Sequence, residues 1–460
     1  EPTSAGRQMG GHFSTRLIDE DGKWLNLTEQ KNSTSDISPT AGQMPRLVGL
    51  GLASKVYRNN KELSHLTNFS KNGDEIAFGT IGDASTSEGV FWESINAACV
   101  LEIPVVMSIW DDGYGISVPK KYQTTKESIS EALAGFELDD KTNGLKIFRC
   151  NGWDYQDLYS AYKNATEFTR KHHKPSLIHV EEITQPQGHS TSGSHERYKS
   201  KERLAWAKEF DCISKFKEWL LSSNNGLGKP ISTLDELNKI EKDAKAEVKS
   251  IAKEAWKEFI QDIETERKAI TSQIELLSSE SGHKQELQKL ISKIKGLKEP
   301  LRKELYQIFK SALRITIKEN TNARKSVLSW FEKQKELLFD KYNSNVYNTY
   351  SSSSLNKGKV APTFNSEELI DGRLILRNNF RTLFKRHPEI LTFGEDTGKI
   401  GGVNQAMEGM QEEFGEIRVF DTGIREASII GQGIGLALRG LRPIAEIQYL
   451  DYLLYAIQIM

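Results

Sequence analysis

The stretch GDASTSEGVFWESINAACVLEIPVVMSIWDDGYGIS, residues 82–117, opens on a Gly-Asp turn and closes on an Asp-Asp turn. An apolar run precedes each turn: EIAFGTIG ends before Asp83, and IPVVMSIW ends before the Asp-Asp pair. Residues 88–101 between the two turns have the apolar spacing of a helix. This strand-helix-strand order predicts an α/β fold in which the two strands lie parallel and are joined by a right-handed crossover.

Two carboxylates are therefore expected at one edge of one sheet, which is where ligands of open α/β folds bind. Asp83 and Asp112 would supply hard oxygen ligands, which suit a Mg²⁺ ion that shares its coordination shell with phosphates. Gly82, Ala84 and Ser85 are small enough for the backbone to approach a phosphate, and the helix would direct its amino end toward it. A single Gly-Asp turn is more often only a turn, so it is the second acidic turn that favours a site.

The same alternation of apolar and amphipathic runs extends over most of the chain. GLKIFRC and PSLIHVEEI read as further buried strands, with a helical pattern at 154–171 between them. Near the carboxyl end we expect a helix at 367–386, strands in EILTFGED, RVFDTG and RPIAEIQY, and a glycine-rich helix in IIGQGIGLALRG. Composition divides the chain into α/β domains at 1–222 and 366–460, a helical insertion at 223–350 and a polar linker at 351–365.

The helical insertion is rich in Lys and Glu and repeats apolar residues at steps of three and four. The first run contains Leu237, Ile240, Ala244, Val248, Ile251, Ala255 and Phe259, and the second contains Leu287, Leu290, Ile294, Leu297 and Leu301. Pro300 is expected to open a new helix. The pattern predicts an antiparallel helical hairpin or a short coiled coil. Because it holds no catalytic constellation, a connector is the favoured interpretation, and a docking arm for a partner is the alternative.

Bulk properties exclude several classes of protein. Lys and Arg number 62 against 63 Asp and Glu, which calls for no nucleic acid and no membrane surface as partner. Cys99, Cys150 and Cys212 lie far apart without metal-ligand spacing, which indicates a reduced intracellular protein. No apolar run approaches the ~20 residues of a membrane span, and the start does not resemble a signal peptide. The missing initial Met and the apolar end LLYAIQIM lead us to expect truncation at both ends.

Several motifs carry a resemblance to a known family. GDASTSEG, followed by the Asp112 of DDGYGIS 29 positions after its Asp, resembles the thiamine diphosphate motif that begins GDG and ends in NN. Through SEG, GYGIS and the later GHSTS, the chain is most similar to the branched-chain type of the decarboxylating component of 2-oxo acid dehydrogenase complexes. Residues 1–215 resemble its α subunit and residues 366–460 resemble the first part of its β subunit, which suggests an α–β fusion. The helical middle has no counterpart in this resemblance.

The resemblance implies a thiamine diphosphate-binding fold with parallel sheets flanked by helices, and a site for the diphosphate. Asp83, Asp112 and the backbone carbonyl of Tyr114 would hold the Mg²⁺ ion that clamps the diphosphate. Ser38 and Thr40 match the segment that touches the aminopyrimidine and thiazolium region of the cofactor. The other cofactor-binding residues on this side would be Gly82, Ala84, Ser85, Gly115 and Ile116.

Two positions depart from the family pattern at this site. Asp111-Asp112 stands where the family usually has Asn-Asn, and Trp110 stands where many branched-chain members have Arg. Both changes make the site less positive, and charge near buried phosphates matters strongly. We therefore expect either compensating cations in a missing amino-terminal segment or weaker cofactor binding. The family's monovalent cation is not expected, because Gln43 fits its site but Ile37 and Gly42 offer no side-chain oxygen.

The resemblance also implies two catalytic side chains. His189, in GHSTS, would handle protons near the substrate, as a His can do near neutral pH. Glu426, in DTGIREASIIGQGIG, would bond the aminopyrimidine ring and so activate the cofactor. Without the resemblance, His189 would be a solvated loop residue and Glu426 a surface charge at a helix start. Ile424 would lie under the bent cofactor, Gln448 and Tyr452 along the pocket, Glu395 and Asp396 in support, and His195, Arg197 and His12 nearby with low weight.

These assignments predict oxidative decarboxylation of a branched-chain 2-oxo acid, with transfer of the acyl group to a lipoyl-bearing acyltransferase. The alternatives are a pyruvate or acetoin dehydrogenase component, a transketolase, and a degenerate scaffold without catalysis. The GHSTS loop and the α-then-β order argue against a transketolase. The two half-sites, residues 82–117 and 422–452, come from neighbouring subunits in the family, so a homo-oligomer is expected. The expected location is the bacterial cytoplasm, or the mitochondrial matrix of a eukaryote.

Overall fold

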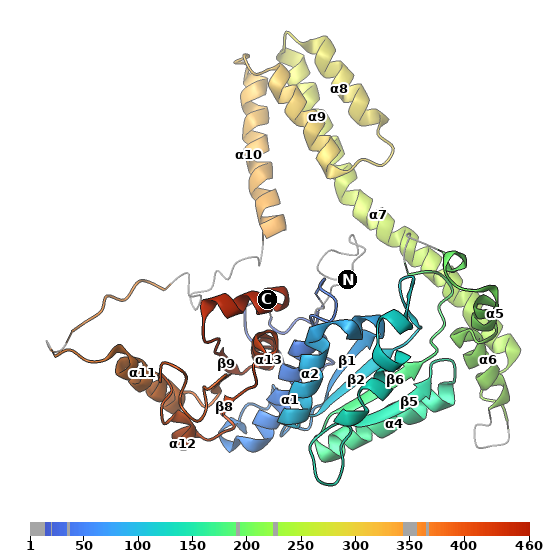
Figure 1. Cartoon of the computed structure of the whole chain (residues 1–460). Helices are drawn as coiled ribbons and strands as arrows, with labels where there is room; N and C mark the ends of the chain where they lie inside the picture. The colour runs from blue at the N-terminus through green and yellow to red at the C-terminus, as the bar shows by residue number, and fades with distance from the viewer. Residues whose placement is uncertain are drawn as a thin grey trace. The chain divides into compact units, whose positions relative to one another are not determined.

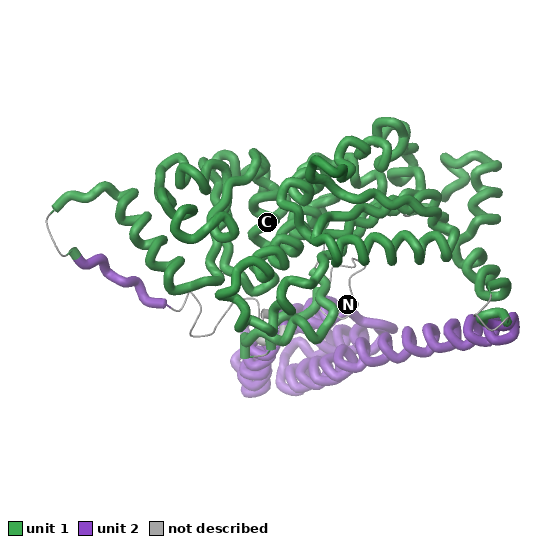
Figure 2. Tube along the Cα trace, turned by 90° about the horizontal axis from the view of Figure 1, so that it is seen from below, with its two compact units in different colours: residues 1–231, 364–460 green, residues 232–363 purple. Residues whose placement is uncertain are grey.

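The computed structural model describes residues 14–19, 21–34, 37–189, 194–223, 229–343, 357–364 and 368–460. They form two compact units, which Figure 2 distinguishes by colour. The first unit comprises residues 1–231 and 364–460, and the second comprises residues 232–363. None of the described helices is both long and apolar enough to span a membrane.

The first half of unit 1 is built on a parallel four-stranded sheet of order β1-β2-β6-β5 (Figure 1). The strands are β1 (Ala77–Gly82), β2 (Val105–Trp110), β5 (Lys146–Asn151) and β6 (Ser176–Glu181). Helix α2 (Gly89–Leu101) connects β1 to β2, and helix α4 (Tyr155–His172) connects β5 to β6. All four predicted strands and both predicted helices are present, so the strand-helix-strand interpretation of this region is confirmed.

Strand β2 is buried on both faces of the sheet, as its unbroken apolar run requires. Val105, Met107 and Ile109 join the main core, which also contains residues of α2 and of helix α1 (Met44–Asn59). Val106, which points to the other face, joins a smaller core with α4. This central position fixes the end of β2, where the Asp-Asp turn begins.

The second half of unit 1 carries a parallel three-stranded sheet of order β8-β7-β9. Its strands are β7 (Ile390–Gly394), β8 (Val419–Asp421) and β9 (Arg442–Ala445), and helix α13 (Glu426–Leu438) connects β8 to β9. Helix α11 (Gly372–Arg386) precedes β7 and begins later than the predicted residue 367, which lies outside the described residues. The start at Gly372 has a local cause: the Asp371 side chain accepts a hydrogen bond from the Arg373 N–H at 3.1 Å and caps the helix.

Helices α1 and α13 pack closely because glycines remove side chains from their interface. A Cβ on Gly431 would lie 2.1 Å from Pro45, and a Cβ on Gly435 would lie 2.3 Å from the Arg46 carbonyl oxygen. Neither distance is possible between non-bonded atoms, so both positions require Gly. The two helices thereby join one hydrophobic core, and the two halves of unit 1 are continuous.

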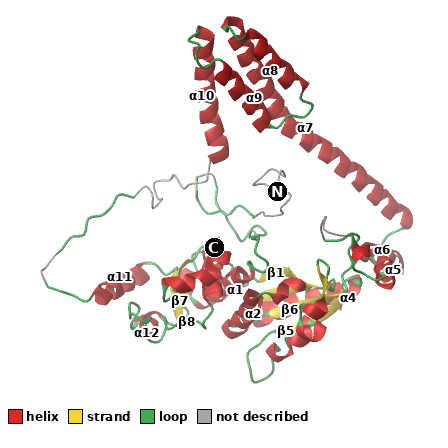
Figure 3. Ribbon diagram, turned by 45° about the horizontal axis from the view of Figure 1, so that its top comes forward, coloured by secondary structure: helices red, strands yellow, loops and turns green. Residues whose placement is uncertain are grey.

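Unit 2 consists of the helices α7 (Leu234–Glu280), α8 (Lys284–Gly296), α9 (Arg302–Ile315) and α10 (Asn322–Asn343) (Figure 3). Helix α8 runs back along the second half of α7, with Gln288 bonded to Ser278 and Lys295 paired with Glu275. A helical hairpin is therefore present, as predicted. The core of the unit begins only near Ile263, so the predicted apolar run from Leu237 to Ala255 is not part of it. The fold class, α/β with parallel sheets and an inserted helical segment, is confirmed.

Shorter elements complete the description of unit 1. They are β3 (Tyr114–Gly115), β4 (Val118–Pro119), α3 (Ile129–Ala132), α5 (Lys201–Glu209), α6 (Cys212–Ser222), α12 (Met410–Phe414), and several 3-10 turns, including Ala84–Ser87 and Leu450–Ile459. Of these, the β3–β4 hairpin matters most here, because it follows the Asp-Asp turn directly.

Candidate active site

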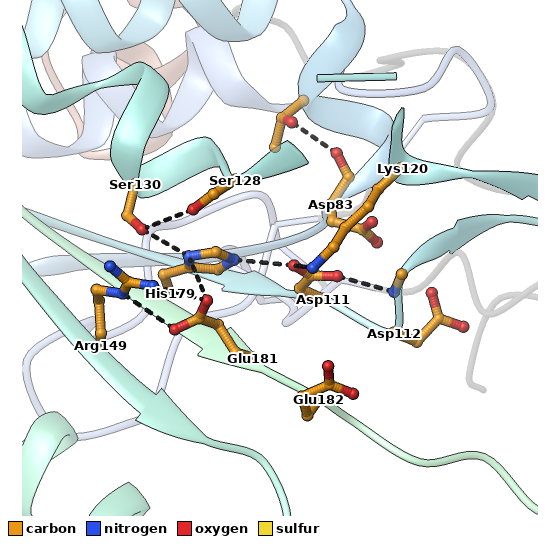
Figure 4. A network of polar contacts seen from close by, with 12 residues as sticks. Asp83, Asp111, Asp112, Lys120, Ser128, Ser130, Arg149, His179, Glu181 and Glu182 are labelled. Atoms are coloured by element: carbon orange, nitrogen blue, oxygen red, sulfur yellow. Dashed lines mark hydrogen bonds and ion pairs between the residues drawn. The ribbon is translucent and has the colours of Figure 1, made fainter. Parts of the chain in front are cut away.

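The two acidic turns lie side by side at the carboxyl ends of β1 and β2. The parallel register pairs Gly82 with Trp110, so Asp83 follows one strand where Asp111 follows the other. The Asp83 N–H continues this pairing and donates to the Trp110 carbonyl at 3.0 Å. Figure 4 shows Asp83, Asp111 and Asp112 gathered at this edge of the sheet.

Asp83 is buried, and its carboxylate lacks a full set of partners. The side chain is 7% exposed, and its Oδ2 atom has no hydrogen-bond donor among the described residues. Burial, followed by the negative charges of Asp111 and Asp112, raises the pKa of Asp83 to about 7. A carboxylate in such surroundings is stabilised either by a proton or by a cation.

Asp111, in contrast, is fully engaged by protein groups. Its Oδ2 accepts hydrogen bonds from Lys120 Nζ and His179 Nε2, both at 3.1 Å, and its Oδ1 accepts from the Gly113 N–H at 2.8 Å. His179 is fully buried, and its Nδ1 lies 2.9 Å from the Ser130 hydroxyl, as Figure 4 shows. Burial alone would raise the pKa of Asp111, but His179 and Lys120 together lower it. The Asp111 carboxylate is therefore ionised, and both of its oxygens accept hydrogen bonds from protein groups.

Asp112 lies on the outer side of the turn. Its Oδ1 accepts from the Tyr114 N–H at 3.2 Å, and its Oδ2 accepts from Gln185 Nε2 at 3.1 Å. Burial raises the pKa of Asp112, while the Tyr114 N–H and the nearby charge of Lys199 act in the opposite direction. The turn itself needs Gly113, which has a φ of +84° that an L side chain rarely adopts.

The hairpin after Asp112 lies against the first acidic turn. A Cβ on Gly115 would lie 2.9 Å from the Ala84 side chain, so only Gly allows this approach. Ile116 follows with a φ of 59° and a side chain that is 48% exposed. The segments 82–85 and 112–116, which the sequence predicted to form one site, are thus brought together.

A second layer of residues covers the hairpin from the segment 194–199. The Tyr198 ring packs against the Tyr114 ring at 5.4 Å, and Lys199 Nζ lies 4.7 Å from the centre of the Tyr114 ring. His195 is buried here, and burial, with the charge of Lys199, lowers its pKa. His189 is exposed and borders residues 190–193, which lie outside the described residues.

A cavity of about 290 Å³ opens above the ends of β1 and β2. Thr40, Gly82, Ser85 and Trp110 are among the residues that line it. Ser38 lies on the same loop, between the lining residues Ile37 and Pro39, and is exposed. The Trp110 indole N–H donates to the Ser108 hydroxyl at 3.0 Å, so this N–H is already engaged within the protein. Trp110 therefore does not supply the positive charge that an Arg would supply at this position.

The residues predicted for the pyrimidine side cluster around the start of α13. Glu426 is only 9% exposed, so its interpretation as a surface charge at a helix start is wrong. It lies close to Glu395, whose pKa is raised by burial and by the charges of Glu426 and Asp396. Gln448 joins this group, since its Nε2 donates to Asp396 Oδ2 at 2.8 Å. Ile424 is 84% exposed and Tyr452 is 40% exposed.

The α1–α13 packing relates the two sides of the site. Gly431 contacts Pro45 near the start of α1, and Arg439 bonds Ser54 farther along, so the helices are parallel. Glu426, at the amino end of α13, therefore lies at the same end of the pair as the loop that precedes α1. That loop lines the cavity above β1 and β2.

The donor set at the acidic turns fits a hard divalent cation. Asp83 and Asp112 are two carboxylates at one edge, and the orphaned Oδ2 of Asp83 is the buried atom that a cation would satisfy. Within the described ranges, no group of three or more His, Cys, Asp or Glu side chains is arranged as a complete metal site. A cation here would need further oxygen ligands from the backbone and from a phosphate, which is the mode typical of Mg²⁺.

Sequence reasoning missed the residues that neutralise this edge. Lys120 and Lys199 supply positive charge within the described part of the chain, whereas we had expected such charge in a missing segment or not at all. His179 interrupts the apolar strand SLIHVE, and a buried polar residue in a strand needs a partner. That rule, applied beside the Asp-Asp turn, could have pointed to the His179–Asp111 pair.

Comparison with known proteins agrees with this arrangement. The family model "Dehydrogenase E1 component" matches residues 12–264, and "Transketolase, pyrimidine binding domain" matches residues 368–460. The first match covers more than half of the chain and reaches into α7, so the view that the whole helical middle lacks a counterpart is wrong. The class that fold and site define is that of thiamine diphosphate-dependent enzymes, and the chain belongs to the dehydrogenase E1 component family.

Curated relatives match the two halves separately. The 2-oxoisovalerate dehydrogenase subunit alpha of Bacillus subtilis is 29% identical over 221 residues, which is 48% of this chain and 56% of that protein. The pyruvate dehydrogenase E1 component subunit beta of Bacillus subtilis is 51% identical over 72 residues, 16% of this chain and 22% of that protein. Its counterpart in Staphylococcus epidermidis (strain ATCC 12228 / FDA PCI 1200) is 47% identical over 77 residues, 17% of this chain and 24% of that protein. An α-like part and a β-like part are thus joined in one chain, which spans little more than half of the first relative and under a quarter of the others.

Proposed function

We propose that this chain forms the thiamine diphosphate site of a decarboxylating 2-oxo acid dehydrogenase component. The observation that carries the proposal is the buried, unpartnered Oδ2 of Asp83 beside the carboxylate of Asp112, at the carboxyl ends of β1 and β2. Leaving a charged oxygen in that position is costly, and a Mg²⁺ ion on a diphosphate would remove the cost. The family matches support the same cofactor independently.

The diphosphate side would bind and orient the cofactor. Asp83, Asp112 and the backbone carbonyl of Tyr114 would hold Mg²⁺, and Gly82 with Ser85 would admit the diphosphate to the cavity they line. Helix α2 begins just beyond this turn, and its amino end would favour the negative charge. Lys199 would offset part of the charge of Asp112.

The pyrimidine side would activate the cofactor and hold its protons. When bound, thiamine diphosphate supplies an electron sink for the electrons released as carbon dioxide leaves a 2-oxo acid. Glu426 would exchange a proton with the pyrimidine ring, in a position where burial keeps water away from the carboxyl group. Ile424, an exposed apolar side chain, would support the cofactor from below, with Gln448 and Tyr452 along the pocket. His189 would handle a proton near the substrate.

The proposed substrate is a branched-chain 2-oxo acid. The support is the similarity of the first half to a 2-oxoisovalerate dehydrogenase α subunit. Pyruvate is the second candidate, because the relatives of the last part of the chain are pyruvate dehydrogenase β subunits. The acyl group would pass to a lipoyl-bearing acyltransferase, and a homo-oligomer is the proposed state. The relatives named above come from bacteria, which supports a cytoplasmic location as part of the proposal.

The direct test is Glu426→Gln in the complete enzyme, supplied with thiamine diphosphate, Mg²⁺ and an artificial electron acceptor. We expect decarboxylation of the preferred 2-oxo acid to fall about a hundredfold, because Gln cannot exchange the proton. Stability should stay equal or rise, since the change relieves repulsion with Glu395. Glu412→Gln, an exposed change in α12, is the matched control and should leave the rate unaltered. An unchanged rate in Glu426→Gln would remove this residue from the site.

A further inference from the structure

The first half of α7 carries an apolar stripe that is not part of the core formed by the described residues of unit 2. The stripe consists of Leu237, Ile240, Ala244, Val248, Ile251 and Ala255. Every residue from 238 to 258 is exposed, and the larger side chains of the stripe are strongly so: Ile240 is 62%, Val248 is 67% and Ile251 is 54% exposed. The core of unit 2 contains residues of α7 only from Phe259 onward. Figure 1 shows α7 as one continuous helix that extends beyond α8 and α9.

The stripe has a period that suits pairing with another helix. Its members recur at steps of three, four and four, so Leu237, Ile240 and Ala244 repeat as Val248, Ile251 and Ala255 after 11 residues. An 11-residue repeat corresponds to about 3.67 residues per turn, which keeps the stripe on one side of a nearly straight helix over this length. The helix start is fixed by a capping box between Thr233 and Glu236. The first half of α7 is thus a capped α-helix with one apolar face.

Charged residues flank the stripe asymmetrically. At the helical period of 3.6 residues, Asp243, Glu247 and Glu254 fall on one side of the stripe. Lys245 and Lys249 fall on the other side. Glu241 also lies on the lysine side, but it forms an i,i+4 ion pair with Lys245. One flank is therefore acidic and the other is predominantly basic.

This asymmetry determines how two copies of the helix could pair. When two identical helices pair in parallel about a two-fold axis along their length, the acidic flank of one copy faces the basic flank of the other on both sides. When they pair antiparallel, acidic faces acidic and basic faces basic, which is destabilising. We propose that the segment Leu234–Glu258 is a parallel two-stranded helical interface between two copies of this chain.

The same pattern disfavours two other occupants of the stripe. A helix that lies on an anionic lipid surface has Lys or Arg along both borders of its apolar face, and here one border is acidic. An unrelated partner helix would need its own complementary flanks, whereas a second copy supplies them without any further condition. The proposal goes beyond the catalytic function and does not depend on it.

Single cysteines in the full chain test the proposal and its direction. In a Cys212→Ser background, which leaves the two buried cysteines Cys99 and Cys150, Ala244→Cys and Ala255→Cys are made separately. At 100° per residue, both positions fall close to the centre line of the stripe, so in a parallel pair each meets its own copy. We expect each variant to form a disulfide-linked dimer in more than half of its chains under mild oxidation. Ala246→Cys, an equally exposed alanine on the opposite face, is the matched control and should stay unlinked.

Charge reversal provides a second, independent readout. Glu247→Lys with Glu254→Lys makes both flanks predominantly basic and should lower self-linking of Ala244→Cys several-fold. Lys245→Glu with Lys249→Glu makes both flanks acidic and should do the same. Mixing the two variants should restore linking, because both flanks then oppose unlike charges. Linking at Ala244 and Ala255 no higher than at Ala246 would overturn the proposal. Linking only between mixed Ala244→Cys and Ala255→Cys chains would also overturn it, since it would show an antiparallel pair or a different cover for the stripe.

Discussion

At the residue scale, the neighbouring carboxylates Asp83 and Asp111, on the two adjacent turns, differ in charge state because their local partners differ. Asp111 is neutralised by Lys120 and His179, whereas Asp83, one strand away, has an oxygen with no donor. Burial acts to raise the pKa of both groups, but His179 and Lys120 outweigh it at Asp111 and lower the pKa there, whereas the pKa of Asp83 rises to about 7. Asp111 therefore stabilises the turn through its hydrogen bonds, and the Oδ2 atom of Asp83 remains available to bind a cation.

Lys120→Met tests the holding role of the Asp111 pair. Removing the ammonium leaves the buried Asp111 carboxylate with hydrogen bonds from His179 and the Gly113 N–H but without its lysine, and we expect a loss of about 2–3 kcal/mol in the free energy of unfolding. Lys120 is 29% exposed, so the loss should stay below that of a fully buried pair. Chemical denaturation of the metal-free chain measures it, with the exposed neighbour Lys121→Met as the control within about 0.5 kcal/mol. Adding Asp111→Asn to Lys120→Met should recover part of the loss, and no recovery would contradict the pairing.

The raised pKa of Asp83 predicts a pH dependence of stability in the metal-free chain. The pKa is higher in the folded state than the ordinary 3.8, so the folded chain binds an additional proton between about pH 4 and pH 7. The contribution of Asp83 to the free energy of unfolding is fully present below the unfolded pKa of 3.8 and is lost as the pH rises to about 7. The free energy of unfolding of Asp83→Asn should therefore rise relative to that of the parent by about 2–3 kcal/mol between pH 5 and pH 8. Parallel denaturation curves at pH 5, 6, 7 and 8 measure the gap, and a gap that does not change with pH would contradict the assignment.

At the scale of elements, the contact between α1 and α13 depends on glycines rather than on large side chains. A Cβ at Gly435 would meet backbone atoms of α1, namely the Arg46 carbonyl oxygen at 2.3 Å and the Leu50 nitrogen at 2.6 Å. Backbone atoms cannot turn aside as side chains can, so the helices would have to separate. Any separation would move Glu426 relative to the loop before α1.

Gly435→Ala should for this reason be costly although Ala favours helices. We expect a loss of about 2–3 kcal/mol in the free energy of unfolding, since overpacking outweighs the propensity gain of about 1 kcal/mol. Gly372→Ala, at the first position of α11, has no atom within 4 Å of the added methyl group and is the matched control. Thermal and chemical unfolding compare the two variants. Equal stability of both would show that the helices do not pack as described.

Sequence patterns predicted the elements of unit 1 well, because buried parallel strands read as nearly continuous apolar runs. β2 and β6 are examples, and the turns that follow them were located from Gly and Asp. The patterns could not show which carboxylate is neutralised, since Lys120 and His179 reach Asp111 from other elements. They also misjudged Glu426, because a helix start looks alike whether it is exposed or covered by a neighbouring helix.

At the scale of the whole molecule, unit 1 combines segments that match two separate family models. The matches at 12–264 and 368–460 meet in one hydrophobic core through α1 and α13. The core brings the amino ends of both helices to one end of the pair, where the cavity above β1 and β2 opens. The first match reaches into unit 2 as far as residue 264, within α7. The sequence pattern of unit 2 predicts only that its helices form, since an apolar stripe does not reveal what will cover it.

The central claim is that Asp83 binds the cation of a thiamine diphosphate site. Calorimetric titration of the complete protein with thiamine diphosphate, with and without Mg²⁺ at pH 8, tests it most directly. We predict Mg²⁺-dependent binding by the parent and a loss of at least a hundredfold in affinity for Asp83→Ala, because one of few direct ligands is removed. Asp139→Ala, a change at a fully exposed aspartate, should bind as the parent does. Equal affinity of Asp83→Ala and the parent would contradict the claim.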